Sequence, residues 1–310
     1  MRIGVTTIAF SKNEYLKSRL LSHFSNVKFN HLEKRLTEKE LIEFLKDIDI
    51  AIIGLDKINH KILNQLPNLK AIVKYGVGLD NIDVIECKKR GIFIGWEPGV
   101  NKLEVAEITI GFMIAHLRNI FSSKINMSNC LWIKDGGKSI SEIKIGIIGL
   151  GNIGKSLVEL LKPFGAKIIA NDIEDHKLYC NTNNILFESK EYIYENCDII
   201  SIHTPLNEST KNMISKREFS IMKKHPFIIN TARGGIVDEV ELENAIIEKK
   251  ISGAAIDVFE NEPIVNESLC KHDNVFCTPH ISGNSNISVV KMGESAINFI
   301  LEFNEKRKNL

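Results

Sequence analysis

The chain has 310 residues and a mass of 35.0 kDa, with 40 basic and 39 acidic side chains and a formal net charge of +1. Hydrophobic residues make up 44% of it and charged residues 25%, which excludes a disordered or fibrous protein. The balanced charge creates no field that would attract nucleic acid or acidic lipid, so we expect neither as a partner. The length predicts about two domains.

The six cysteines are scattered, with no pair at the C-x-x-C spacing. This pattern is typical of free thiols in a reducing compartment rather than of a disulfide framework or a zinc site. The N-terminal residues lack the features of a signal peptide, and no apolar run is long enough for a membrane span. We therefore expect a cytoplasmic protein without a bound metal.

Short apolar runs alternate with helical patterns over the first part of the chain. Strands are expected at 2–10, 26–32, 48–55, 69–76 and 91–96. Thr37 and Glu40 form a capping-box pattern at the start of a helix over 37–47. Such alternation predicts parallel strands joined by helical crossovers, in a doubly wound α/β sheet that is covered on both faces.

A long helical pattern from residue 101 to about 121 follows, and its length suits a connection between two lobes. Val105, Ile108, Phe112 and Ala115 recur along it at helical spacing, with further apolar residues around most of its circumference. One lobe cannot cover every side of such a helix, so we expect a partner subunit to cover part of it. The sequence thus predicts a homodimer.

A second α/β series begins near Ile143 and predicts a second lobe. Its expected strands lie at 142–151, 166–172, 197–206, 226–234, 252–259 and 274–281. Asp238 is expected to cap a helix over 238–250, and a closing helix is expected over 288–308. A ligand is expected between two such lobes.

Three glycines form a G-x-G-x-x-G motif between an expected strand and an expected helix. Gly149 allows a tight turn, Gly151 lets the backbone approach a pyrophosphate, and Gly154 lets the helix pack closely on the strand. Asp172 ends the next strand, about 20 residues further on, where a carboxylate binds the adenosine ribose. No arginine follows Asp172 to receive a 2′-phosphate, so NAD is favoured over NADP; a plain tight turn is the alternative.

Three charged residues follow later strands, at the ends where a doubly wound sheet binds its ligands: Arg233, Glu262 and His280. An arginine can bind a carboxylate with two hydrogen bonds, and a histidine can exchange the proton of a carbinol near neutral pH. A neighbouring glutamate can orient the imidazole. Alone, each residue could be an ordinary solvated charge, but with a nicotinamide they form the parts of hydride transfer between NAD and a 2-hydroxy acid.

The segments GIIGLGNIG, HTPLNEST, INTARGGIVDE, AAIDVFENEP and TPHIS occur in an order that resembles the D-isomer-specific 2-hydroxyacid dehydrogenases. YGVGLDNID and PGVNKLEVAE extend the resemblance into the first half of the chain. It implies an NAD-dependent oxidoreductase and a homodimer. Since nothing follows the closing helix in the sequence, we expect the small regulatory domain of some phosphoglycerate dehydrogenases to be absent. The resemblance also implies a Rossmann NAD-binding domain at 99–281, inserted into a flavodoxin-like substrate-binding domain at 1–98 and 282–310.

The same resemblance assigns roles to individual residues. Arg233 would bind the substrate carboxylate and carbonyl, Glu262 would support the histidine, and His280 would be the acid/base. His203 would be at most a cofactor-pocket residue. Asp257 would lie near the nicotinamide carboxamide. The residues placed along the rest of the cofactor are Val77, Asn152, Ile153, Asp172, Thr204 and Thr231. Val77 would also touch the substrate. Gly76 and Gly78 would offer backbone N–H groups to the substrate carboxylate.

The turn KYGVGLDNID looks most like the phosphoglycerate dehydrogenase branch, and Lys74 adds a cation that could pair with a phosphate. This predicts 3-phosphoglycerate, oxidised to 3-phosphohydroxypyruvate, as the substrate. If Lys74 faces solvent instead, hydroxypyruvate, glyoxylate or another 2-keto acid is the alternative. Trp96 could narrow the substrate pocket or cover a lobe boundary. A role as an NAD-sensing corepressor is a further alternative, which the Arg233, Glu262 and His280 set disfavours.

Overall fold

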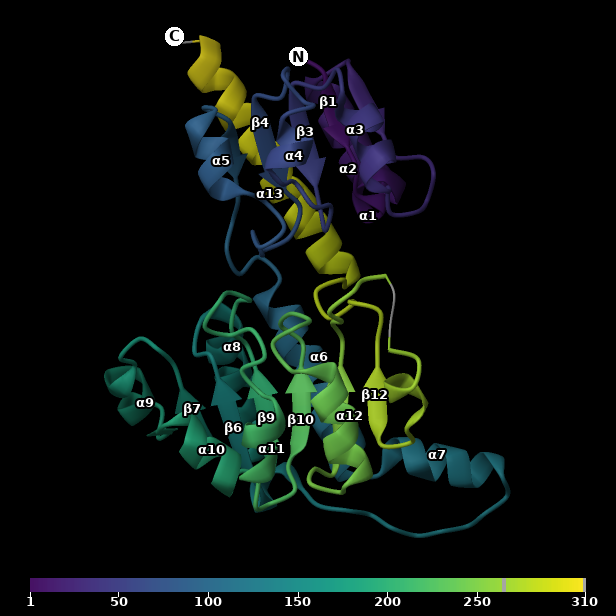
Figure 1. The fold of residues 1–310 in the computed structure, drawn as a ribbon, viewed down its shortest axis with the longest axis vertical. Coiled ribbons are helices and arrows are strands. Elements are labelled where there is room, and N and C mark those ends of the chain that lie inside the picture. The colour runs from purple at the N-terminus through teal and green to yellow at the C-terminus, as the bar shows by residue number, and fades with distance from the viewer. Residues whose placement is uncertain (264–265, 309–310) are drawn as a thin grey trace. The chain divides into compact units, whose positions relative to one another are not determined.

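The computed structural model describes residues 1–263 and 266–308. The chain divides into two compact units, which we call unit 1 and unit 2 (Figure 1). Unit 1 comprises Met1–Asn101 together with the segment that begins at Asn284, and unit 2 comprises Lys102–Gly283. No helix among the described residues is both long enough and apolar enough to cross a membrane.

Five parallel strands form the sheet of unit 1: β1 Ile3–Val5, β2 Val27–Phe29, β3 Ile50–Ile53, β4 Ala71–Lys74 and β5 Phe93–Gly95. Their order, β2-β1-β3-β4-β5, is that of flavodoxin-like sheets. The three inner strands are buried throughout, as expected when helices cover both faces. The first strand is shorter than the expected 2–10, because a helix already begins at Ile8.

Helices cover both faces of this sheet. α1 Ile8–Lys12, α2 Glu14–His23 and α13 Asn286–Lys308 share one core with it. α3 Glu38–Leu45, α4 His60–Leu63 and α5 Val84–Lys89 share the other. The capping box of Thr37 and Glu40 is present at the start of α3, as predicted. Because α13 packs on the sheet, the last part of the chain completes the core of unit 1.

Seven parallel strands form the sheet of unit 2: β6 Lys144–Ile148, β7 Lys167–Asn171, β8 Leu186–Phe187, β9 Ile199–Ile202, β10 Phe227–Asn230, β11 Gly253–Ile256 and β12 Val275–Cys277. Their order is β12-β11-β10-β9-β6-β7-β8. Counted from β6, this is the Rossmann order with one more strand at the edge. The sequence did not predict β8, which is too short to show a strand periodicity.

Two layers of helices cover the sheet of unit 2. α6 Lys102–Leu117, α8 Asn152–Leu161 and α9 Lys177–Thr182 share one core with it, and α10 Lys190–Asn196, α11 Lys216–Ser220 and α12 Glu239–Ile247 share the other. Figure 1 shows α11 and α12 in front of the strands and α6 behind them. The predicted α/β class with two doubly wound parallel sheets is thus confirmed.

The helix expected from 101 to 121 is two helices, α6 and α7 Ile120–Ser128. Asn119, between them, has φ +52° and lies in the left-handed region, which ends α6. The apolar pattern continues across this break, so periodicity alone could not reveal it. Three short 3₁₀ turns complete the described elements of unit 2: Ile140–Glu142, Lys162–Phe164 and Leu269–Lys271.

Candidate active site

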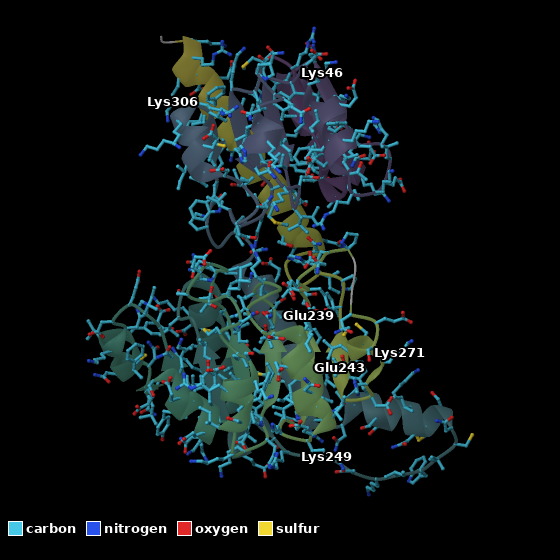
Figure 2. All side chains as sticks on the ribbon, in the orientation of Figure 1. Lys46, Glu239, Glu243, Lys249, Lys271 and Lys306 are labelled. Atoms are coloured by element: carbon cyan, nitrogen blue, oxygen red, sulfur yellow. The ribbon has the colours of Figure 1, made fainter. Side chains whose placement is uncertain are left out.

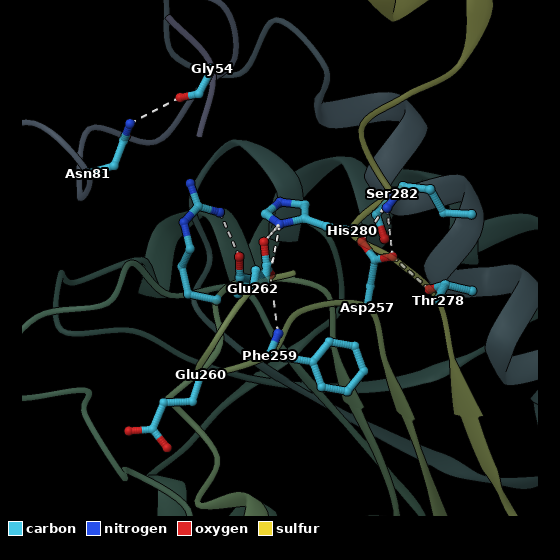
Figure 3. Close-up of polar contacts among 12 residues, drawn as sticks. Gly54, Asn81, Asp257, Phe259, Glu260, Glu262, Thr278, His280 and Ser282 are labelled. Atoms are coloured by element: carbon cyan, nitrogen blue, oxygen red, sulfur yellow. Dashed lines mark hydrogen bonds and ion pairs between the residues drawn. The ribbon is translucent and has the colours of Figure 1, made fainter. Parts of the chain in front are cut away.

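A histidine–glutamate pair lies beyond the carboxyl ends of β11 and β12 (Figure 3). His280 Nδ1 is 2.9 Å from Glu262 Oε1 and 2.8 Å from Oε2. The backbone N–H of Phe259 donates to Glu262 Oε1 at 3.2 Å. Because Nδ1 faces a carboxylate, we assign its proton to Nδ1, which leaves Nε2 to exchange a proton with another group.

The loop that carries His280 is held by a buried carboxylate, that of Asp257 (Figure 3). Asp257 Oδ1 accepts hydrogen bonds from Thr278 Oγ1 at 2.6 Å and from the Ile281 N–H at 2.8 Å, and Oδ2 accepts from the Ser282 N–H at 2.9 Å. The His280 N–H donates to the Asp257 carbonyl at 2.8 Å. His280 itself has φ +55°, so these bonds fix a backbone conformation that residues with a β-carbon rarely adopt.

This function of Asp257 was missed in the sequence. The available signal was topological, because β11 and β12 are parallel neighbours and residues after their ends must lie close together. Asp257 follows β11, and the 278–282 loop follows β12. The expected place of Asp257 near a nicotinamide carboxamide stays a prediction.

Arg233 follows β10, the next strand of the same sheet edge. Asn230, the last residue of β10, shapes the turn: its Nδ2 donates to the Arg233 carbonyl at 2.9 Å and its Oδ1 accepts from the Ala232 N–H at 3.1 Å. Arg233 Nη1 donates to the Ala232 carbonyl at 2.6 Å. The three predicted catalytic residues thus follow three adjacent strands of unit 2.

The glycine-rich turn before α8 has the geometry of a phosphate-binding site. Gly149 has φ +98°, and a Cβ on Gly154 would lie 2.1 Å from the Gly149 carbonyl oxygen, so neither position accepts a larger residue. A Cβ on Gly151 would meet nothing within 4 Å. No side chain caps α8 at Gly151, so open space lies before its first N–H groups, which attract anions. These residues fit the pyrophosphate of a dinucleotide.

The other residues predicted from the motif lie around this turn. Asn152 and Ile153 form the first turn of α8, and Asp172 directly follows β7. Asp172 Oδ2 accepts from the Leu150 N–H at 2.5 Å, and Oδ1 accepts from the Glu174 N–H at 3.0 Å. The Asp172 carboxylate therefore lies directly beside the glycine-rich turn.

Two predicted threonines follow the central strands β9 and β10. Thr204 Oγ1 is buried and has no hydrogen-bond partner among the described residues, so it is available to a ligand. Thr231 Oγ1 lies 3.3 Å from Thr109 Oγ1 on α6. His203 Nε2 lies 2.8 Å from Ser201 Oγ, and burial lowers the pKa of His203 to about 4. The imidazole of His203 is thus neutral at pH 7, and its place in the cofactor pocket stays a prediction.

In unit 1, Lys74 ends β4 and is only 5% exposed. Its Nζ donates to the Gly54 carbonyl at 2.5 Å and to Asn81 Oδ1 at 2.6 Å. Asn81 Nδ2 donates to the carbonyls of Gly54, at 3.0 Å, and of Asp56, at 2.5 Å (Figure 3). Lys74 is therefore buried rather than solvent-facing, and Asn81, which was not singled out in the sequence, fixes its ammonium group.

The turn Gly76–Gly78 follows β4 and is half-buried. Gly76 has φ +120°, a conformation that favours glycine. The indole N–H of Trp96 donates to the Val77 carbonyl at 2.6 Å, and the Trp96 side chain is 37% exposed. Trp96 thus helps to hold the turn in place.

Residues 110–282 match the family model described as "D-isomer specific 2-hydroxyacid dehydrogenase, NAD binding domain". The chain belongs to this family. The predicted family and NAD as the cofactor are thereby confirmed.

Curated relatives that are named for different activities have similar sequence identities to this chain. The chain is 37% identical over 269 residues to a glyoxylate reductase of Thermofilum pendens, covering 84% of this chain and 79% of the relative. It is 35% identical over 261 residues to a hydroxypyruvate reductase of Thermotoga maritima, covering 82% and 83%. It is 36% identical over 249 residues to a D-3-phosphoglycerate dehydrogenase of Methanocaldococcus jannaschii, covering 79% of this chain and 48% of that relative. The chain spans about half the length of the phosphoglycerate dehydrogenases that it matches.

Solved structures agree with this fold. A D-lactate dehydrogenase from Aquifex aeolicus, complexed with NAD and lactic acid, superposes with a TM-score of 0.87 at 25% identity, over 99% of this chain and 96% of that one. The apo-structure of D-lactate dehydrogenase from Escherichia coli gives 0.84 at 24% identity, over 99% and 98%. The second match shows the fold alone.

Proposed function

We propose that this 2-hydroxyacid dehydrogenase transfers a hydride between NAD and a 2-hydroxy acid or its 2-keto acid. The observation that carries the proposal is the hydrogen-bonded pair of His280 and Glu262, at the same sheet edge as Arg233 and in the NAD-binding domain. When bound, NAD accepts the hydride of the hydroxy acid, and NADH returns it to the keto carbon.

The chain supplies the proton and the binding groups. His280 Nε2 donates a proton to the keto oxygen during reduction and accepts it during oxidation, because Glu262 keeps the other proton on Nδ1. Arg233 binds the substrate carboxylate through its planar guanidinium. The family resemblance assigns the N–H groups of the Gly76–Gly78 turn as further ligands of the carboxylate, and Val77 as a contact of substrate and cofactor.

The same proposal covers the cofactor. Gly151, Asn152 and Ile153 bind the pyrophosphate through the open N-terminus of α8. Asp172 binds the adenosine ribose beside the glycine-rich turn. Thr204 places its unpartnered hydroxyl along the cofactor. Thr231 and Asp257 are placed there by the family resemblance.

For the acid itself, we favour an unphosphorylated 2-keto acid such as glyoxylate or hydroxypyruvate. The case for 3-phosphoglycerate depends on the Lys74 ammonium, which is buried and donates to Gly54 and Asn81. The relatives of comparable length are named glyoxylate reductase and hydroxypyruvate reductase. The phosphorylated acid stays the second candidate, because a phosphoglycerate dehydrogenase is equally similar in the part that aligns.

Steady-state kinetics with NADH test both parts of this proposal. We expect kcat/KM for glyoxylate or hydroxypyruvate to exceed that for 3-phosphohydroxypyruvate by about 10-fold or more. A higher kcat/KM for 3-phosphohydroxypyruvate, together with a fall in kcat/KM for that substrate alone in Lys74→Ala, would support 3-phosphoglycerate as the substrate. Failure to reduce any 2-keto acid would overturn the proposed function.

A homodimer is also proposed, but on a different surface from the one that the sequence indicated. Most apolar residues of α6, including Val105, Phe112 and Ala115, are buried by the chain itself. Seven exposed apolar residues instead lie on α7 and just after it: Ile120, Phe121, Ile125, Met127, Leu131, Trp132 and Ile133. Exposed apolar side chains gathered in one segment are typical of a subunit interface. The expected cytoplasmic location stays a prediction.

A further inference from the structure

Glu262 is presented by a tight turn over 259–262 that lies directly on the segment after Arg233. A Cβ on Gly234 would be 2.0 Å from both the carbonyl carbon and the carbonyl oxygen of Phe259, so only glycine permits this approach. The Phe259 side chain is 5% exposed and packs in the core beside α10–α12. Two contacts therefore fix the backbone of the turn: the close approach of the Phe259 carbonyl to Gly234, and the packing of the Phe259 side chain in the core.

Glu239 holds the same turn through its side chain. Its Oε1 accepts a hydrogen bond from the Glu260 N–H at 2.6 Å. Glu239 is the first residue of α12, but Asp238 caps that helix, accepting from the N–H groups of Val240 and Glu241 at 3.1 Å each. Figure 2 shows Glu239 at the start of α12, with Lys249 beyond the opposite end. The Glu239 carboxylate therefore binds the neighbouring turn, while Asp238 caps the helix.

Two consecutive N–H groups of the turn thus donate to two carboxylates. The Phe259 N–H donates to Glu262, which binds His280, and the Glu260 N–H donates to Glu239. The Glu260 side chain extends away from His280 (Figure 3). We propose that Glu239 is a positioning residue, which fixes the 259–262 turn and so the place of Glu262 against His280. This inference depends on the proposed function, since it concerns the proton exchange at His280.

The Glu239 carboxylate is half-buried and has acidic neighbours. Burial raises the pKa of Glu239, the nearby charges of Glu260, Asp238 and Glu262 raise it further, and the Glu260 N–H opposes them. The charges of Glu239 and Glu262 therefore interact, and the Glu260 N–H is the hydrogen bond that stabilises the ionised Glu239 carboxylate.

The experiment compares Glu239→Gln, which keeps an oxygen acceptor without the charge, with Glu239→Ala, which removes both. We expect Glu239→Ala to lower kcat for keto-acid reduction about 10-fold with little change in KM, since a small displacement of a catalytic group is costly. Glu239→Gln should recover most of kcat. Glu248→Gln, at the exposed end of the same helix, is the control and should change neither kcat nor KM.

Hydrogen exchange of the Glu260 amide, followed by NMR, gives a readout besides activity. It should be faster in Glu239→Ala than in the wild type and close to the wild type in Glu239→Gln. An active wild type with unchanged kcat and unchanged exchange in both variants would overturn the inference, as would a loss of stability alone with an unchanged kcat. A wild type that reduces no 2-keto acid would instead overturn the proposed function, while the exchange experiment would still test the contact.

Discussion

His280 combines a strained backbone with a fixed side chain. Its φ of +55° costs about 1–3 kcal/mol in a residue other than glycine. The Asp257 carboxylate offsets that cost with bonds to Thr278, Ile281 and Ser282, while Glu262 fixes the imidazole. Both restraints come from residues that follow β11. Strain retained at such cost is typical of a position where a side chain must be aimed at a reacting atom.

The first prediction concerns this residue. Replacing His280 with alanine should lower kcat by about 10²–10⁴-fold while NADH affinity changes little, because the imidazole provides the proton and does not build the phosphate site. Rapid kinetics and NADH fluorescence titration measure the two quantities. Arg233→Lys is the companion variant: it should mainly raise KM, since an ammonium cannot form two parallel hydrogen bonds to a carboxylate. Activity of His280→Ala within a few-fold of the wild type would contradict the assignment.

Residue types and motifs were predictable where their chemistry is local. Capping boxes and the glycine-rich turn need only a few consecutive residues, so Thr37 and Gly149 were placed correctly from the sequence. The partners of Lys74 were not predictable, because Gly54 and Asn81 reach it from two different loops. Nothing in a strand's periodicity tells whether a lysine at its end turns to solvent or to a neighbouring carbonyl.

At the scale of elements, the site depends on where strands end. Arg233, the 259–262 turn and His280 follow β10, β11 and β12, and the Rossmann order makes these strands neighbours. The alternation of strands and helices predicts that arrangement, since right-handed crossovers leave few alternatives. It does not predict the break at Asn119, because the apolar pattern of α6 runs on into α7.

The second prediction concerns the junction of β6, α8 and β7. Asp172 accepts from the Leu150 N–H and should repel the 2′-phosphate of NADP. The wild type should prefer NAD, and Asp172→Ala should narrow the ratio of kcat/KM for NAD to that for NADP by about 10-fold or more. Asp175→Ala removes an exposed acid that lies two residues before α9 begins, and it serves as the control for net charge. This variant should leave the ratio of kcat/KM for NAD to that for NADP close to that of the wild type. Equal efficiency of the wild type with both cofactors would refute this assignment.

At the scale of the whole chain, unit 1 is discontinuous in sequence. The chain leaves it after Asn101 and returns at Asn284, and α13 then contributes Met292, Ala296 and Ile300 to the unit's core. Unit 2 is therefore an insertion, and the folding of unit 1 requires both ends of the chain. A variant truncated before α13 would lose these buried contacts.

The last prediction concerns the assembly of the chain. In the apolar surface of α7 and residues 131–133, Trp132 is 83% exposed and Leu131 is 50% exposed. Covering such side chains stabilises a contact by roughly 25 cal/mol per Å² of apolar surface removed from water. A second copy is the occupant that we propose, because one surface then covers the other about a two-fold axis. Light scattering at micromolar concentration should therefore give twice the chain's mass of 35.0 kDa.

The double variant Leu131→Ser with Trp132→Ser should weaken this dimer about 10-fold or more in its dissociation constant, as measured by sedimentation. Leu178→Ser on α9 replaces an apolar residue that is also 83% exposed in the same unit, so it is the matched control and should leave the dimer intact. A wild type of 35.0 kDa would exclude the dimer. A double variant that dimerises as tightly as the wild type would show that the interface lies elsewhere on the chain.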